Sequence, residues 1–467
     1  MDALRHCFPP NLRQYLNELP ETLDETYEQI LKGINKAQKD NAHRLLQCLT
    51  VAVRPLLVEE LAELLAFDFQ ASTSGGIPTL KKDWRWDDQE EAVLSTCSSL
   101  ITIIPHDDTR VVQFSHFSVK EFLTSSRLAH SRHGEISRFR IDLELAHTIT
   151  AQACLATLLQ LDEHGSKSDA NGSPLVNYAA EHWVDHAQFE KVSSRIQEGM
   201  DDLFDSSKPH FAAWLKVHDI DDDWLGFSVN SPDGVGSPLY YAAFCGFYDL
   251  AESLIMKHSE QVNARGGRNL FPLPAALYKR HFHVANLLHS HGAVIDVRGN
   301  FEHTPLRAAS LFGQVDIMRW LLDHGADANA QANRRLTPLS AATYHRHLDA
   351  VQVLLEHDAY INSQSDDGET PLYWALWLGG PEGKVADTVR RLLEHGADPN
   401  IRTDYHSTPL HKASAHGLLE PARLLLSYGA KVDEKNKNGK TPFQLAASEG
   451  HDEMTKLLLE HGALPHQ

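Results

Sequence analysis

Small and apolar residues recur at helical spacing in the second half of this 467-residue chain, and their pattern restarts about every 33 residues. Each unit opens with proline after Ser, Thr or Phe, continues as a helix of small residues, turns, and ends in a helix with paired leucines. The prolines that open the units, which we call the opening prolines, lie at 238, 272, 305, 338, 371, 409 and 442, at intervals of 34, 33, 33, 33, 38 and 33. This period predicts a solenoid of stacked helix pairs, an architecture that typically binds other proteins.

The residues that open and close each unit have physical roles. Proline suits the first helical position because its missing N–H needs no partner there, and the preceding Thr can cap the helix. A glycine after the second helix supplies the left-handed residue that ends it. In two units, Asp358 and the His258-Ser259 pair stand at the position of this glycine. We expect the helices of these two units to fray first, because residues other than glycine adopt the left-handed conformation less readily. The leucine pairs of five units are Leu321-Leu322, Leu354-Leu355, Leu392-Leu393, Leu425-Leu426 and Leu458-Leu459.

This pattern resembles the ankyrin repeat. The resemblance implies a mostly α fold, with seven helix-turn-helix units and β-hairpin tips over residues 237–467. The fifth unit carries five extra residues around Gly379–Lys384, between its two helices. They are expected to project from the edge opposite the tips, either as a second contact or as a tolerated bulge.

Residues 1–160 lack this period and predict a different domain. Thr22-Leu-Asp-Glu25 forms a capping box before a helix, and Ser118-Val-Lys-Glu121 forms another. Further helices are expected over about 41–53, 58–66 and 89–98. The β-rich runs Leu100–Ile104 and Val111–Phe114, joined through Asp107 and Asp108, predict a hairpin. Helices followed by a hairpin favour a winged-helix-like domain.

Three segments, Leu19–Tyr27, Arg54–Glu63 and Phe114–Leu123, resemble the region that follows the ATPase in fungal NACHT proteins with C-terminal ankyrin repeats. In that family an NTPase switch lies upstream, a winged-helix module transmits its state, and the repeats sense a partner. The phosphate-loop motif of such an ATPase is missing here, because Glu434 stands where the motif preceding Gly439-Lys440-Thr441 needs its first glycine. Met1 is therefore expected to start either a natural short paralogue or a truncated gene model.

Residues 161–236 join the two parts. Gly165–Ser173 is polar, and a helix is expected after Pro174, where the wording of Tyr178–His186 again resembles the NACHT-ankyrin linker. We interpret this segment as a helical cap that shields the first repeat, although degenerate repeats remain an alternative. Its expected core residues are Trp183, Trp214 and Trp224.

The overall charge narrows the classes of partner. A formal net charge of −20 disfavours nonspecific binding to nucleic acid or to an anionic membrane. The five cysteines show no C-x-x-C spacing, no run approaches 18 apolar residues, and the N-terminus does not resemble a signal peptide. These features predict a cytoplasmic protein, with the nucleus as the alternative, that has reduced thiols and needs no cofactor.

Candidate chemistry is sparse. His324, His357, His395 and His461 each precede a helix-ending turn, where an imidazole can bond free carbonyl groups, and His345-Arg-His347 is too short a cluster for a metal site. Ser115-His116 lacks the G-x-S-x-G elbow of a hydrolase. The third helix of the winged-helix domain is acidic rather than basic, which disfavours DNA readout. We therefore expect a protein that is not an enzyme.

The same outward position of each first helix carries a large apolar residue in five successive units. Exposed aromatic surface usually marks an interface, although packing between adjacent repeats is an alternative explanation. The position holds Phe244, Tyr278, Leu311, Tyr344, Trp377, Ala415 and Ser448, and Phe312 lies beside it.

The hairpin tips are expected to form a charged rim that is basic, then acidic around the fifth and sixth units, then basic. Such a rim would orient an extended partner of complementary charge. Its residues are Arg265 and Arg268, Arg298 and Asn300, Arg334 and Arg335, Asp366 and Asp367, Asp404 and Tyr405, and Lys435 and Lys437.

Together these patterns predict an interaction scaffold or sensor that binds a protein partner on the concave face of the solenoid. The family resemblance implies a role in fungal nonself recognition or signalling. The alternative is the C-terminal regulatory part of a larger P-loop NTPase switch.

Overall fold

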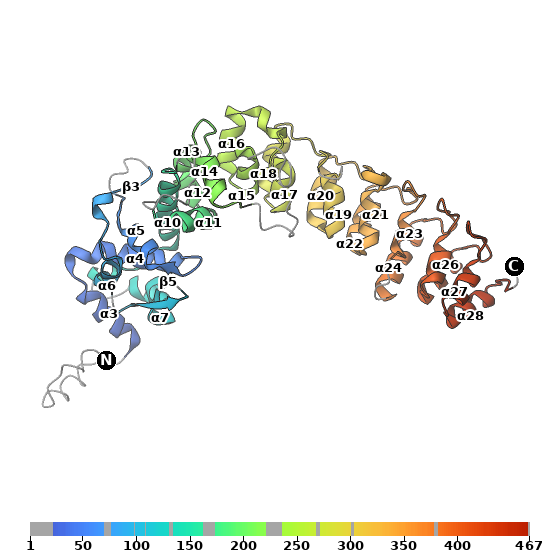
Figure 1. Cartoon of the computed structure of the whole chain (residues 1–467), viewed down its shortest axis with the longest axis horizontal. Coiled ribbons are helices and arrows are strands. Elements are labelled where there is room, and N and C mark those ends of the chain that lie inside the picture. The colour runs from blue at the N-terminus through green and yellow to red at the C-terminus, as the bar shows by residue number, and fades with distance from the viewer. Residues whose placement is uncertain are drawn as a thin grey trace. The chain divides into compact units, whose positions relative to one another are not determined.

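The computed structural model describes residues 22–69, 76–97, 99–107, 109–129, 134–161, 173–220, 236–267, 271–299, 303–377 and 382–465. The chain divides into two compact units, Met1–His258 and Ser259–Gln467, and is mostly helical in each (Figure 1). The first predicted repeat thus falls in the N-terminal unit. The proposed division into 1–160, 161–236 and 237–467 stays a prediction. Arg268, Asn300, Trp224, Asp108 and residues 379–381 of the insertion lie outside the described residues.

The N-terminal unit begins with a winged-helix arrangement. Its antiparallel sheet has the order β1-β5-β4, with Leu56 opposite Val112 and Ile101 opposite Phe114. The predicted hairpin is confirmed as β4 and β5, whereas the two-residue strand β1 was not predicted. The elements are α3 (Leu23–Gly33), α4 (Lys39–Val51), β1 (Leu56–Leu57), α5 (Val58–Leu65), β2 (Phe67–Asp68), β3 (Thr79–Leu80), α6 (Gln89–Cys97), β4 (Ile101–His106), β5 (Thr109–Phe114), α7 (Phe117–Thr124), α8 (Ser126–Ala129) and α9 (Gly134–Ser137).

One of the two predicted capping boxes forms. Thr22 accepts from the Glu25 backbone N–H at 3.2 Å, and the Glu25 carboxylate accepts from the Thr22 N–H at 3.3 Å. The box predicted at Ser118 is wrong. Helix α7 is capped instead by His116, whose Nδ1 accepts from the Ser118 N–H at 3.3 Å, while the Ser118 hydroxyl contacts the Tyr27 hydroxyl at 2.7 Å. The tertiary contact with α3 thus uses the hydroxyl that would have capped the helix.

An aromatic core holds the second half of the N-terminal unit together. Trp183 and Trp214 are fully buried with ring centroids 5.4 Å apart, and Trp183 also lies 5.5 Å from Phe247, before α16. The linker helices thus pack against the first helix pair of the repeats, which begins at the first opening proline. The elements are α10 (Leu143–Leu158), α11 (Val176–Ala187), α12 (Val192–Arg195), α13 (Gln197–Leu203), α14 (His210–Val217), α15 (Pro238–Cys245) and α16 (Tyr248–Lys257).

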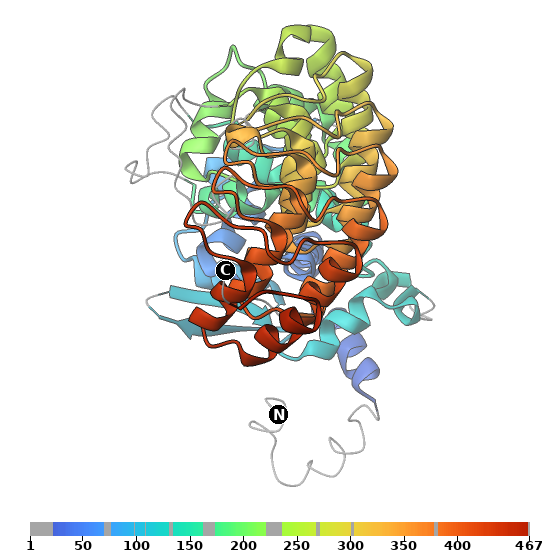
Figure 2. The same ribbon diagram turned by 90° about the vertical axis from the view of Figure 1, so that its right-hand side faces the viewer.

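The C-terminal unit is built from helix pairs that each begin at an opening proline. First helices pack on first helices, as α19 on α21 and α25 on α27, and second helices pack on second helices, as α20 on α22 (Figure 2). The helices are α17 (Pro272–Tyr278), α18 (Phe282–Ser290), α19 (Pro305–Phe312), α20 (Val315–Asp323), α21 (Pro338–His345), α22 (Leu348–Glu356), α23 (Pro371–Ala375), α24 (Glu382–Glu394), α25 (Pro409–Ala415), α26 (Leu419–Ser427), α27 (Pro442–Ser448) and α28 (Asp452–Glu460).

The predicted caps explain why the pairs repeat. Threonine hydroxyls cap α19, α21, α23, α25 and α27, each with proline at the first helical position. Gly325, Gly396, Gly429 and Gly462 end second helices with φ near +90°, whereas Asp358 does so at φ 58°. His258 departs from the prediction, because α16 ends there without a left-handed residue.

Candidate functional site

Four aromatic rings form a cluster, which we call the aromatic cluster, on the first helices of two successive repeats. It consists of Tyr344 from α21, Tyr373 and Trp374 from α23, and Trp377 just after α23. The Trp374 ring lies 5.5 Å from Tyr344 and 5.2 Å from Trp377, and Tyr373 lies 6.4 Å from Trp377. These separations are typical of favourable aromatic pairs.

Lys412 of α25 extends the aromatic cluster into the next repeat. Its ammonium nitrogen lies 3.9 Å from the centroid of the Trp377 ring and 5.8 Å from that of Tyr373. Burial lowers the pKa of Lys412, and the nearby Glu369 carboxylate opposes that shift. Burial also raises the pKa of Glu369. A partly desolvated ammonium over an indole ring makes a strong cation–π contact.

The structure divides the predicted outward positions into exposed and packed ones. Trp377 is 37% exposed and Phe312 44%, whereas Tyr278, Leu311 and Tyr344 are half-buried. Phe244 is wrong as an exposed residue, because it is only 7% exposed and stacks at 6.3 Å on Tyr240 within α15. Ring packing therefore accounts for part of the predicted column, and an accessible aromatic surface remains around Trp377.

Trp374 was missed by the sequence analysis. It lies three residues before Trp377, a spacing that places two side chains on the same side of a helix. The equivalent position holds Ala341 in the preceding repeat and Lys412 in the following one, so no column of like residues marks it. The helical spacing from Trp377 was the signal that could have found it.

The predicted charged rim is partly neutralised by pairing between neighbouring tips. Arg334 forms an ion pair with Asp367, and the Asp366 N–H donates to the Arg334 carbonyl at 3.1 Å. The Asp404 N–H likewise donates to the Asp367 carbonyl at 2.9 Å. These bonds tie the tips together, so Asp367 and Arg334 contribute less to a charged rim than their sequence suggests.

The remaining rim residues lie at the surface. Tyr405 is 63% exposed, the Lys437 ammonium lies 5.8 Å from its ring, and the Lys437 N–H donates to its carbonyl at 2.9 Å. Arg298, Arg335, Asp366 and Asp404 are exposed. These exposed residues are basic at Arg298 and Arg335, acidic at Asp366 and Asp404, and basic at Lys437, in the predicted order. That this order orients a partner stays a prediction.

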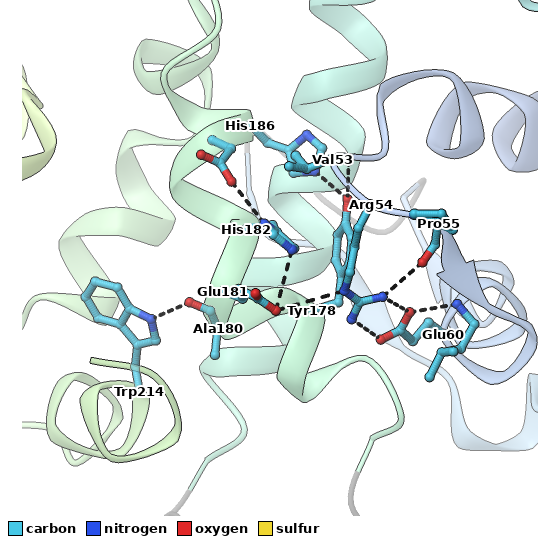
Figure 3. A network of polar contacts seen from close by, with 12 residues as sticks. Val53, Arg54, Pro55, Glu60, Tyr178, Ala180, Glu181, His182, His186 and Trp214 are labelled. Atoms are coloured by element: carbon cyan, nitrogen blue, oxygen red, sulfur yellow. Dashed lines mark hydrogen bonds and ion pairs between the residues drawn. The ribbon is translucent and has the colours of Figure 1, made fainter. Parts of the chain in front are cut away.

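A second polar site lies inside the N-terminal unit, where the winged-helix part meets α11. Arg54 donates two hydrogen bonds to the buried Glu60 carboxylate, at 2.6 and 2.9 Å, and its guanidinium lies 5.0 Å from the centre of the Tyr178 ring. The Glu60 carboxylate also accepts from the Leu57 N–H at 2.8 Å. Figure 3 shows Arg54 between Glu60 and Tyr178, with Glu181 also nearby.

The same site continues into a buried chain of hydrogen bonds. The Tyr178 hydroxyl accepts from the Val53 N–H at 3.3 Å, and it also lies within hydrogen-bond distance of His186 Nε2, at 2.9 Å. His186 Nδ1 lies 2.9 Å from His147 Nδ1, and burial lowers the pKa of His186 to about 3. A neutral His186 thus links α10, α11 and the end of α4 without a buried charge.

The histidines at helix ends have the structural role that was predicted. Nδ1 of His324, His357, His395 and His461 lies 2.7–2.9 Å from the carbonyl oxygen four residues earlier. Among the described residues, no group of three or more His, Cys, Asp or Glu side chains could hold a metal ion. None of the described helices has the length and apolar character needed to cross a membrane.

The chain is similar to two protein families. A family described as ankyrin repeats (3 copies) matches residues 239–332, 327–403 and 381–467, and a family described as GPI inositol-deacylase, winged helix domain, matches residues 27–136. The fold therefore combines an N-terminal winged-helix domain with C-terminal ankyrin repeats.

One relative is the "Azaphilone pigments biosynthesis cluster protein L" of Monascus ruber, which is 31% identical over 293 residues. The match covers 59% of this chain and 60% of that protein, so the chain spans less than two thirds of that relative.

Proposed function

We propose that this chain is a non-enzymatic scaffold or sensor whose ankyrin repeats capture a protein partner on the face formed by their first helices. The observation that carries the proposal is the aromatic cluster, where the partly exposed Trp377 lies under Lys412. Ankyrin repeats are protein-binding structures, and partly exposed tryptophans are frequent hot spots of protein interfaces.

The geometry supports a partner that covers Trp377 and the edge of Tyr344. Covering these rings would remove apolar surface from water, and the rigid stack of first helices would hold them without much loss of side-chain entropy. The rim residues Arg298, Arg335, Asp366, Asp404 and Tyr405 would set the orientation of the partner.

The biological setting follows from resemblance. The winged-helix and ankyrin combination is similar to fungal NACHT-ankyrin proteins, which supports a role in nonself recognition or signalling. The acidic chain supports binding to protein rather than to nucleic acid or membrane, in the cytoplasm or the nucleus. The name of the Monascus ruber relative adds a second setting, a biosynthetic gene cluster.

The second candidate function is the regulatory part of a larger P-loop NTPase switch. The chain of contacts from Arg54, through its cation–π contact with Tyr178, to the hydrogen bond between Tyr178 and His186 favours it, because such a chain would transmit a shift of the winged helix to the linker helices. Mapping the 5′ end of the transcript tests this candidate. An upstream exon encoding a phosphate loop would support it.

Affinity capture from the native cell extract tests the first candidate. The bait with Trp374→Ala and Trp377→Ala is expected to lose specific proteins that the wild-type bait retains. Tyr360→Ala is the matched control, since Tyr360 is a 68% exposed aromatic outside the cluster. Circular dichroism verifies that each bait is folded. If the double variant captures the same proteins as the wild type, the aromatic cluster is not the binding site.

A further inference from the structure

Arg307 of α19 is a buried arginine, and two of its three guanidinium nitrogens lack a hydrogen-bond partner among the described residues. The residue is 6% exposed, and its Nε and Nη1 atoms are buried without a hydrogen-bond acceptor among the described residues. Burial lowers the pKa of Arg307. An ionised group removed from water without a partner carries a large desolvation cost, so buried arginines are normally paired.

Three other repeats satisfy the equivalent side chain, which lies two residues after the opening proline. Ser340 and Gln444 accept from the backbone N–H of their capping threonines at 2.9 and 3.1 Å. His411 bonds both to Thr408 and, at 3.2 Å, to the Lys440 carbonyl. At the same position of its repeat, Arg307 has a long cationic side chain. Its Nε and Nη1 find no acceptor among the described residues.

The charge of Arg307 acts on two histidines. Its charge contributes to lowering the pKa of His303 from the loop before α19, and of His345 at the end of α21. Burial is the largest cause for both histidines, and His347 and Arg346 also act on His345. The neighbourhood therefore favours an anion.

Arg307 lies on α19, which packs on α21, the helix that carries Tyr344 of the aromatic cluster. The His345 ring, on which the charge of Arg307 acts, is 4.9 Å from the Tyr344 ring, and Tyr344 packs on Trp374. A single extended segment of a partner could therefore contact both features.

We propose that Arg307 receives a carboxylate side chain of the protein partner, beside the aromatic cluster. This inference rests on the proposed function and specifies the partner as a segment with an acidic residue next to apolar ones. A planar guanidinium matches a carboxylate through paired hydrogen bonds, which are strong where water is excluded. The net charge of −20 does not oppose this pairing, because exposed charges farther than about 8 Å away are largely screened at physiological salt.

Selection from a random twelve-residue peptide library tests the inference on the full chain. We expect the wild type to retain peptides with Asp or Glu at a fixed separation from an aromatic or large apolar residue. Arg307→Met should lose the acidic preference and keep the apolar one, and Trp374→Ala with Trp377→Ala should lose the apolar preference. Arg307→Lys keeps the charge without the planar geometry and should fall between them.

The affinities of one selected peptide for the wild type and for the variants then measure the strength of the contact between Arg307 and the peptide carboxylate. Arg307→Met, and separately replacement of the acidic peptide residue by Ala, should each weaken binding by about tenfold to a hundredfold. The two changes together should weaken it no further than either alone, because they remove the same contact. Additive losses would overturn the inference.

Other outcomes separate the two proposals. Peptides that are apolar but show no acidic preference would overturn the carboxylate inference and leave the proposed function standing. Failure of all variants and the wild type to retain any peptide would overturn both. Without peptide, Arg307→Met should have a urea midpoint equal to or above that of the wild type, since it removes an unpaired buried charge. A clearly lower midpoint, or failure to fold, would show that Arg307 serves the fold instead.

Discussion

At the residue scale, His411 couples a helix cap to pH. Its Nδ1 accepts from the Thr408 N–H at 3.2 Å, and its Nε2 donates to the Lys440 carbonyl at 3.2 Å, so only the neutral ring fits. Burial lowers its pKa to about 4. The unfolded state binds a proton near pH 6.5 and the folded state only near pH 4, so the contribution of His411 to stability is complete above pH 6.5 and declines below it.

We therefore predict that the free energy of unfolding falls on acidification from pH 7.5 to 5.5, with His411 contributing about 1 kcal/mol of the loss. Urea unfolding at the two pH values measures it. His411→Gln is the matched variant, because Gln444 accepts from its capping threonine at the same position of α27. This variant should fold and show a smaller pH dependence, and an unchanged dependence would contradict the prediction.

At the element scale, the ends of second helices depend on one left-handed residue. Asp358 adopts φ 58° where Gly325 adopts φ 91°, and a side chain placed on Gly325 would meet no atom within 4 Å. The two positions thus differ in backbone strain rather than in packing.

We predict that Asp358→Gly raises the free energy of unfolding by about 0.5 to 1 kcal/mol, because glycine adopts this conformation without steric cost. The reverse exchange, Gly325→Asp, should lower it by a similar amount. Urea denaturation of both variants checks the pair. Destabilisation by Asp358→Gly would mean that the Asp358 side chain contributes a contact worth more than the relief of strain.

The join between α5 and α11 depends on a buried ion pair. Glu60 is 1% exposed, and Arg54 supplies the charge that compensates it. Arg54→Met leaves that carboxylate unpaired and should lower the free energy of unfolding by about 2–3 kcal/mol. Changing Glu60→Leu as well should recover part of the loss in urea denaturation. If it recovers nothing, the contact of Arg54 with the Tyr178 ring, rather than the charge, accounts for the effect.

At the scale of the whole molecule, the chain consists of two compact units, and the boundary between them in the sequence follows His258. We predict that calorimetry resolves more than one transition, with a calorimetric enthalpy above the van't Hoff enthalpy. Arg54→Met should shift one transition and Asp358→Gly the other, because the two residues belong to different units. A single transition that both substitutions shift equally would contradict this division.

The sequence by itself determined the features that depend on near neighbours in the chain. The proline period, the threonine caps, the helix-end histidines and the β4-β5 hairpin were all predicted, and the structure bears them out. The caps, the histidine bonds and the hairpin turn involve groups within a few residues of one another, and the proline period repeats such a local pattern, so spacing along the chain is sufficient to specify them. The helical and winged-helix fold class followed from these elements.

Only the tertiary structure decided which side chains are covered or paired across repeats. It buried Phe244, brought Trp374 between Tyr344 and Trp377, and paired Arg334 with Asp367. It also left Nε and Nη1 of Arg307 without an acceptor in the part of the chain that the structure describes. The contacts of Trp374 with Tyr344 and of Arg334 with Asp367 join residues about 30 positions apart, and their geometry is set by how helix pairs stack and not by any spacing within one repeat.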